Sequence, residues 1–277
     1  MIEAILEQWP LWGLTHRKPA LADVSALPRG MTNQCWRLHL PEQQVVVRVH
    51  ADNSVVLDID REREYRLQRW AVSHGLAPRV LYRARNDAYW LMEFVDGRCA
   101  KPESDLLSLA HAMNSLHSHP PPEGVTGWRL ADKTGAYWAA LEQQGVELLS
   151  LKTDLQQLAL IQSVASLHVC HMDTNPDNWR LTTQGWKLLD WEYATVGSRL
   201  WDLAGFAQAC ELSPPQIRQW CQLFHVEPDS WPWRWARWQL RYLAELWFGV
   251  QNINTGRALE CSLQQLLEDG IRLQSAQ

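Results

Sequence analysis

The chain has 277 residues, of which 46% are hydrophobic and 21% are charged, and its formal net charge is -5. This is an ordinary globular composition, long enough for one large domain or two modest ones. The acidic balance gives no general attraction to nucleic acid, and no apolar run is long enough to span a membrane, so we expect neither kind of partner.

The cysteines are scattered and show neither the paired spacing of a metal site nor that of a redox motif. The first residues lack the basic start and apolar segment of a secretory signal. We therefore expect a cytoplasmic protein from a reducing compartment, with free and buried cysteines. The six cysteines are Cys35, Cys99, Cys170, Cys210, Cys221 and Cys261.

The first third of the chain is rich in strand patterns, with apolar alternation bounded by turn-forming residues. Two helical patterns are embedded in it. The predicted elements are, in chain order, a helix over 1–16, a turn over 27–34, hairpin strands over 35–40 and 44–49, a helix over 61–74, and strands over 80–82 and 88–92.

The remainder of the chain has mainly helical patterns, and the change near Asp96 predicts a boundary there. We expect residues 1–95 to form a β-sheet lobe and residues 96–277 a helical lobe, which together make an α+β fold. The predicted elements here are helices over 106–117, 137–149, 152–165 and 211–228, a hairpin of strands 178–181 and 186–189, and an aromatic helix that includes 235–247.

The polar stretch HMDTNPDN, residues 171–178, has the His-x-Asp-x4-Asn spacing of a kinase catalytic loop. A carboxylate there can orient the proton of an attacking hydroxyl, and the later asparagine can turn back to bind Mg²⁺ on the phosphates of ATP. Asp190 ends an apolar strand shortly afterwards, where kinases hold a metal-binding carboxylate. The alternative interpretation of these acidic residues is a polar turn.

These motifs resemble the aminoglycoside phosphotransferase and choline kinase superfamily over about residues 25–250, and most closely its bacterial thiamine kinase and choline kinase branches. The resemblance rests on residues 171–178, on Asp190-Trp191-Glu192-Tyr193-Ala194 and on Trp201-Asp202-Leu203-Ala204. It implies a protein-kinase-like two-lobe fold and an ATP-dependent phosphotransferase that uses Mg²⁺.

The resemblance also implies roles in the helical lobe. Asp173 would be the catalytic base or hydroxyl-orienting residue, and His171 would support its loop. Asn178 and Asp190 would hold Mg²⁺. Asp202 would accept hydrogen bonds from the backbone of the catalytic loop, and its alternative role is a carboxylate stabilised by the helix dipole.

In the first lobe, the resemblance puts Arg48 in the place of the phosphate-binding strand lysine, paired with Glu64 on the next helix. The alternative for Glu64 is a solvated helix charge. The turn that contains Gly30 would cover the phosphates. Backbone groups of Glu93 and Val95 would bind adenine.

The acceptor is expected beside the late aromatic helix, where Trp235, Trp238, Tyr242 and Trp247 have helical spacing. Glu192 and Trp247 are the candidate substrate-binding residues, because an organic cation binds well to aromatic faces near a carboxylate. Core packing is the alternative for these aromatic residues.

Thiamine is the first expected acceptor, followed by choline or ethanolamine and then by an aminoglycoside. A pseudokinase that binds without catalysis is the alternative of a different class. His117 is expected to be a packing or capping histidine. The sequence indicates no particular oligomeric state.

Overall fold

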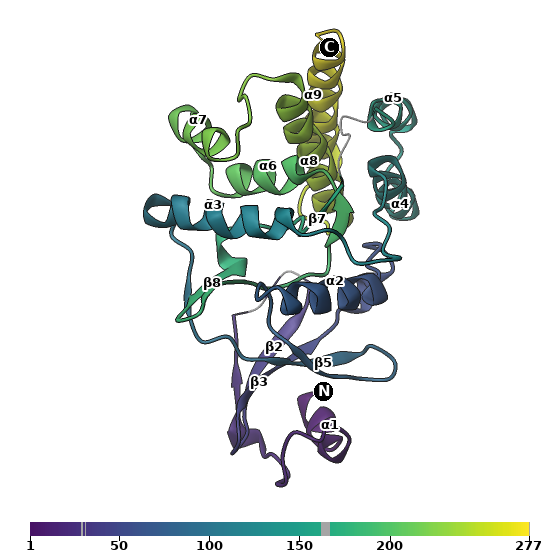
Figure 1. Cartoon of the computed structure of the whole chain (residues 1–277). Coiled ribbons are helices and arrows are strands. Elements are labelled where there is room, and N and C mark those ends of the chain that lie inside the picture. The colour runs from purple at the N-terminus through teal and green to yellow at the C-terminus, as the bar shows by residue number, and fades with distance from the viewer. Residues whose placement is uncertain (29, 31, 162–166, 277) are drawn as a thin grey trace.

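The computed structural model describes residues 1–28, 30, 32–161 and 167–276 (Figure 1). An antiparallel five-stranded sheet, in the order β1-β2-β3-β5-β4, forms most of the N-terminal lobe. The predicted hairpin is confirmed, and Cys35 faces Arg48 across it. The strands are β1 (Val24–Ala26), β2 (Gln34–His39), β3 (Gln44–Val49), β4 (Val80–Arg83) and β5 (Tyr89–Glu93).

The helix predicted over residues 1–16 is wrong in length. The structure has α1 (Ile2–Leu6), followed by a 3-10 turn (Trp9–Leu11). Pro10 lacks the N–H that a longer helix needs, and Gly13 adopts a left-handed φ of 64°. The segment packs against the sheet through Ile5, Leu6 and Trp12.

Helix α2 (Arg61–Ser73) lies between the sheet and the helices of the C-terminal part (Figure 1). It begins at Asp60, whose carboxylate accepts hydrogen bonds from the N–H groups of Glu62 and Arg63, each at 3.0 Å. Leu67 and Trp70 of α2 belong to the same buried cluster as residues of the helical lobe. The helix therefore ties the two lobes together.

The C-terminal lobe contains two small β elements among its helices. Its strands are β6 (Arg98–Cys99), β7 (His168–Cys170), β8 (Trp179–Thr182), β9 (Gly185–Leu188) and β10 (Thr195–Gly197). They form the antiparallel sheet β6-β8-β9 and the antiparallel pair β7–β10.

The helices of this lobe differ from the predictions mainly at their ends. They are α3 (Pro102–Ser118), α4 (Leu130–Gln143), α5 (Leu149–Ala159), α6 (Arg199–Ala209), α7 (Pro214–Leu223), α8 (Trp231–Val250) and α9 (Gly256–Gln274). The first helix predicted there starts earlier than expected, and so does α4. The predicted end of the helix over 152–165 lies largely outside the described residues, and α9 was not predicted.

The late aromatic residues are core, with one exception. Trp235, Trp238 and Tyr242 are at most 2% exposed, whereas Trp247 is only partly buried. The hydroxyl of Tyr242 accepts a 2.7 Å hydrogen bond from Nε1 of Trp138. Burial with paired polar atoms identifies the first three as packing residues, and leaves Trp247 as the acceptor candidate.

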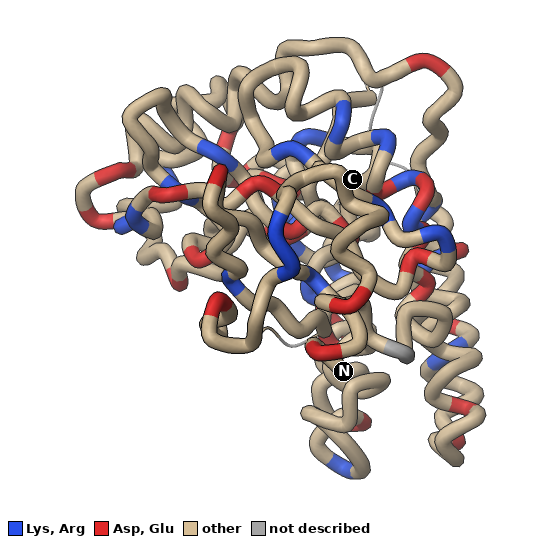
Figure 2. The backbone as a smooth tube through the Cα atoms, turned by 90° about the horizontal axis from the view of Figure 1, so that it is seen from below, with Lys and Arg blue, Asp and Glu red and all other residues tan. Residues whose placement is uncertain are grey.

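All six cysteines are free, but the expectation that they are buried is wrong for the exposed Cys99 and Cys261. Acidic and basic residues are interspersed along the backbone when the molecule is seen from below (Figure 2). Within the described residues, none of the helices is long and apolar enough to cross a membrane.

Candidate active site

The catalytic-loop stretch follows β7 and closes on itself. Asp173 accepts hydrogen bonds at Oδ1 from the side-chain amide of Asn175 and at Oδ2 from that of Asn178, both at 2.8 Å. Asn178 Nδ2 also donates to the backbone oxygen of Asp173 at 2.9 Å. These bonds fix the carboxylate, and they turn the amide oxygen of Asn178 away from it, which leaves that oxygen to meet a cation.

Asp202 lies in the first turn of α6 and is completely buried. Its carboxylate accepts hydrogen bonds from the backbone N–H groups of His171 at 2.9 Å and Met172 at 2.8 Å. Met172 has a left-handed φ of 68°, so the loop is held in a strained turn by this carboxylate.

A third donor reaches Asp202 from α3. Nε2 of His117 lies 3.0 Å from Oδ2 of Asp202. Sequence reasoning missed this contact, because the two residues are 85 positions apart and no local spacing connects them.

His171 is fully buried and supports the loop from within. Its Nδ1 accepts a 3.3 Å hydrogen bond from the N–H of Asp173, and its ring meets Trp191 edge to face. Burial lowers the pKa of His171, so the ring is neutral. A neutral ring with an accepting Nδ1 orients Asp173 through the backbone.

Asp190 lies two residues after the end of β9 and adopts a left-handed φ of 61°. The N–H of the preceding Leu189 donates to the backbone oxygen of Asn178 at 2.8 Å, which holds the two predicted metal ligands on neighbouring segments. Asp190 Oδ1 lies 2.6 Å from Nη2 of Arg48. Burial raises the pKa of Asp190 to about 7, against the opposing attraction of Arg48.

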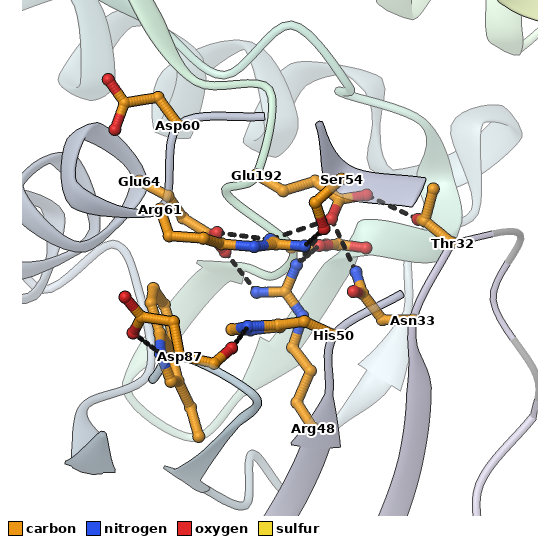
Figure 3. Close-up of polar contacts among 12 residues, drawn as sticks. Thr32, Asn33, Arg48, His50, Ser54, Asp60, Arg61, Glu64, Asp87 and Glu192 are labelled. Carbon is orange, nitrogen blue, oxygen red and sulfur yellow. Dashed lines mark hydrogen bonds and ion pairs between the residues drawn. The ribbon is translucent and has the colours of Figure 1, made fainter. Parts of the chain in front are cut away.

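Arg48 on β3 is buried and faces carboxylates from two other segments (Figure 3). It pairs with Glu64 of α2, with Asp190, and with Glu192 at 3.1 Å. Arg61 adds a second guanidinium, 2.7 Å from Glu64 and 3.2 Å from Glu192. Two fixed positive charges thus face three carboxylates.

Glu192 is directed toward the N-terminal lobe. Besides the two arginines, its carboxylate accepts hydrogen bonds from the hydroxyl of Thr32 at 2.5 Å and from the amide of Asn33 at 2.7 Å (Figure 3). The residue is 3% exposed. The residues after Gly30 therefore reach the active site through Glu192.

Gly30 itself has no backbone conformation that requires glycine, and a Cβ at this position would make only an ordinary contact with the oxygen of Asn33. Its neighbours Arg29 and Met31 lie outside the described residues.

His50, also in Figure 3, lies near Arg48 and adds no positive charge there, because its ring is neutral. Burial and, to a lesser extent, the charge of Arg48 together lower the pKa of His50 to about 3. Its Nδ1 lies 2.6 Å from the oxygen of Asp87, so a neutral ring is held by that contact. No motif or spacing in the sequence pointed to this residue.

The segment after β5 is the predicted adenine contact. The N–H of Glu93 donates to the oxygen of Arg79 at 2.9 Å. Val95 is half-buried, and its N–H has no hydrogen-bond partner within the part of the chain that the structure describes. That N–H is open to a nucleobase acceptor.

Trp247 on α8 reaches the segment that follows Asp190. Its Nε1 donates to the hydroxyl of Tyr193 at 2.8 Å. The structure therefore brings Asp173, Asn178, Asp190 and Arg48 into one site, with Trp247 beside it through Tyr193. The carboxylate of Glu192 meets this site at Arg48 and is otherwise paired with residues of the N-terminal lobe.

Residues 23–245 match the family described as the phosphotransferase enzyme family. The chain belongs to this family. A curated relative, the thiamine kinase of Salmonella typhimurium, is 31% identical over 193 residues, which cover 68% of this chain and 65% of the relative. The chain thus spans less than two thirds of that relative's length.

Solved structures of other kinases are similar to this chain in fold. Choline kinase LicA from Streptococcus pneumoniae is 17% identical, with a TM-score of 0.77 over 98% of this chain and 99% of that chain. The ethanolamine kinase of Plasmodium vivax is 14% identical, with a TM-score of 0.73 over 95% of this chain and 83% of that chain. The predicted protein-kinase-like two-lobe fold is confirmed.

Replacing Asp202 tests how the catalytic loop is held. In Asp202→Ala, the N–H groups of His171 and Met172 lose their acceptor, which should cost about 1–3 kcal/mol of unfolding free energy for each. Hydrogen exchange at both amides should accelerate, and urea unfolding should give the free energy. Asp132→Ala is the matched control, because Asp132 also lies in a first helical turn but is exposed. Equal effects of the two substitutions would contradict this role.

Proposed function

We propose that this protein transfers the terminal phosphate of ATP to the hydroxyl group of a small alcohol, and that thiamine is its preferred acceptor. The observation that carries the proposal is the meeting of Asp173 and Asn178 with Asp190 and Arg48. A hydroxyl-orienting carboxylate, two oxygen ligands and a phosphate-binding guanidinium are the parts that phosphoryl transfer needs.

The nucleotide is assigned to the space between the lobes. The open N–H of Val95 supports an adenine contact, and the segment of Thr32 and Asn33 supports a cover over the phosphates. LicA, which has this fold, has been solved in complex with AMP. Glu64 orients Arg48 toward the phosphates through their ion pair.

The donor set fits Mg²⁺. Asn178 and Asp190 offer oxygen atoms, which this hard cation prefers, and the network of two guanidinium groups and three carboxylates leaves one negative charge to neutralise. Mg²⁺ bound at these residues would neutralise negative charge on the phosphates of ATP. Asp173, held by its two asparagines, orients the acceptor hydroxyl and receives its proton.

A small, singly charged acceptor agrees with the residues around the site. The rings of Trp247 and Tyr193 can take an organic cation. Helix α8 has one acidic residue, Glu245, which supports thiamine or choline over a polycationic aminoglycoside. The 31% identity with a thiamine kinase supports thiamine as the first choice. We assign Glu192 to anchoring the nucleotide lobe, since its oxygens are already paired there.

The carboxylate of Asp173 is tested by Asp173→Asn. We expect kcat to fall by about 10²–10⁴-fold because the substitution removes the proton-accepting carboxylate, at the cost of one of its two hydrogen bonds from the asparagines, while the affinity for ATP with Mg²⁺ stays largely unchanged because Asn178 and Asp190 remain. ADP release and calorimetry measure the two quantities. Asp177→Asn, in the same loop but exposed, is the control and should keep kcat within about twofold. Full activity of Asp173→Asn would contradict the assignment.

An acceptor panel tests the substrate. Thiamine, choline, ethanolamine and kanamycin are incubated with ATP and Mg²⁺, and the phosphorylated product is detected by ³¹P NMR. We expect the highest kcat/KM for thiamine. If choline is turned over and thiamine is not, the proposed acceptor becomes choline or a related amino alcohol. Absence of any product would favour a binding module without catalysis.

Trp247 is tested by Trp247→Phe, which keeps a ring but removes the hydrogen bond to Tyr193. We expect the KM of the acceptor to rise by about tenfold while the KM of ATP is unchanged, because the lost bond of about 1 kcal/mol and a weaker cation–π contact act on the acceptor alone. Trp231→Phe is the control, since Trp231 lies on the same helix and also donates from Nε1, to Leu273. A change confined to the KM of ATP would refute the acceptor role.

A further inference from the structure

Residues 52–60, here called the strap, connect β3, which carries Arg48, to α2, which carries Glu64. The middle of the strap is packed on the other lobe. Leu57 is fully buried in the cluster formed by helices α4, α5, α8 and α9, and Ile59 packs against the same cluster. The strap therefore inserts N-terminal residues into the core of the C-terminal lobe.

A buried ammonium group holds the strap there through hydrogen bonds. Lys133 on α4 is 2% exposed, and its Nζ donates to the backbone oxygens of Leu57 at 2.7 Å and Asp58 at 2.5 Å. The Asp58 carboxylate lies 3.2 Å away. Asp58 has a left-handed φ of 51°. Three oxygens thus meet the three donors that an ammonium group offers.

Lys133 also touches the acceptor side of the site. Its Nζ lies 5.2 Å from the ring centroid of Tyr137 and 5.9 Å from that of Tyr193. Tyr193 directly follows Glu192 and is bonded to Trp247. The ammonium therefore lies between the strap and the segment that carries Asp190 and Glu192.

The other end of the strap enters the arginine network. Arg61, the first residue of α2, donates to Oγ of Ser54 at 2.8 Å, which ties the end of the strap to its start (Figure 3). The same guanidinium contacts Glu64 and Glu192. A shift of the strap would consequently move Arg61, and with it the carboxylates that orient Arg48.

We propose that Lys133 is a positioning residue for phosphoryl transfer: its ammonium holds the strap on the C-terminal lobe and thereby keeps Arg61 and Glu64 aligned with Arg48. This inference rests on the proposed function for its kinetic test alone. Because Lys133 acts through the strap, its loss should weaken ATP use without removing any group that touches the nucleotide.

The pH dependence follows from the surroundings of Lys133. Burial lowers its pKa to about 8, and Asp58 partly offsets this effect. The charged and titratable groups that face it are Asp58 of the strap, Arg63 of α2, Tyr137 of α4, and Glu192 and Tyr193 after β9. The ammonium contact is complete well below pH 8 and is lost as the pH rises through about 8.

Stability should respond in the opposite direction. Between about pH 8 and 10.5 the unfolded chain holds the Lys133 proton and the folded chain has lost it, so this group makes the free energy of unfolding rise with pH. If activity falls above pH 8 while the Lys133 contribution to the free energy of unfolding does not fall, the loss of activity comes from lost positioning and not from general destabilisation.

The experiment compares Lys133→Met, which removes the charge, with Lys133→Arg, which keeps it at all working pH values. For Lys133→Met we expect about a tenfold higher KM for ATP, equivalent to about 1.4 kcal/mol, and faster hydrogen exchange over residues 54–60. Lys133→Arg should restore both and remove the decline above pH 8. Lys152→Met is the control, since Lys152 pairs with Glu142 on the surface.

Asp58→Asn provides a second variant if Lys133→Met fails to fold, because asparagine tolerates the left-handed backbone. Unchanged KM for ATP and unchanged exchange over 54–60 in a folded Lys133→Met would overturn the proposal. If no acceptor is turned over, the proposed function fails separately, and the Kd of ATP with the exchange rates still decides the role of Lys133.

Discussion

The buried guanidinium of Arg48 is the contact on which the arrangement of the site depends. Its partners come from α2 and from the segment after β9, so three separate parts of the chain must meet around one charge. Leaving a buried charge without its partner costs about 3–5 kcal/mol. The sheet, α2 and the catalytic hairpin therefore all meet at this one desolvated group, which Arg61 supports through Glu64 and Glu192.

The same network sets the electrostatic character of the site. Glu64 and Glu192 each meet both arginines, whereas Asp190 meets Arg48 alone. The excess negative charge consequently lies at Asp190, on the side of Asn178. Burial raises the pKa of Asp190 and keeps His50 neutral, so a cation at this edge would relieve an existing imbalance.

The sequence predicted those parts of the site whose residues lie close together along the chain. The catalytic loop, its asparagine and the strand that leads to Asp190 follow one another closely in the chain, so their meeting depends on short-range structure. The partners of Glu192 depend instead on packing between the lobes, and the contact of Asp202 with His117 depends on packing of α3 against α6 within the C-terminal lobe. Thr32 and Asn33 lie about 160 positions from Glu192, and no periodicity reports such a contact. The hydrogen bonds from Lys133 to two backbone oxygens could not be predicted from the sequence either, because every residue has a backbone carbonyl group whatever its side chain.

The burial of Leu57 has a consequence for how the molecule folds. The boundary predicted near residue 96 lies between the five-stranded sheet and the mainly helical part of the chain, but Leu57 and the inner face of α2 complete cores that belong to the helices. An isolated fragment ending at that boundary would expose these apolar side chains to water. The two lobes should therefore melt together in one cooperative transition, and a protease that cuts between them should release neither as an independently stable unit.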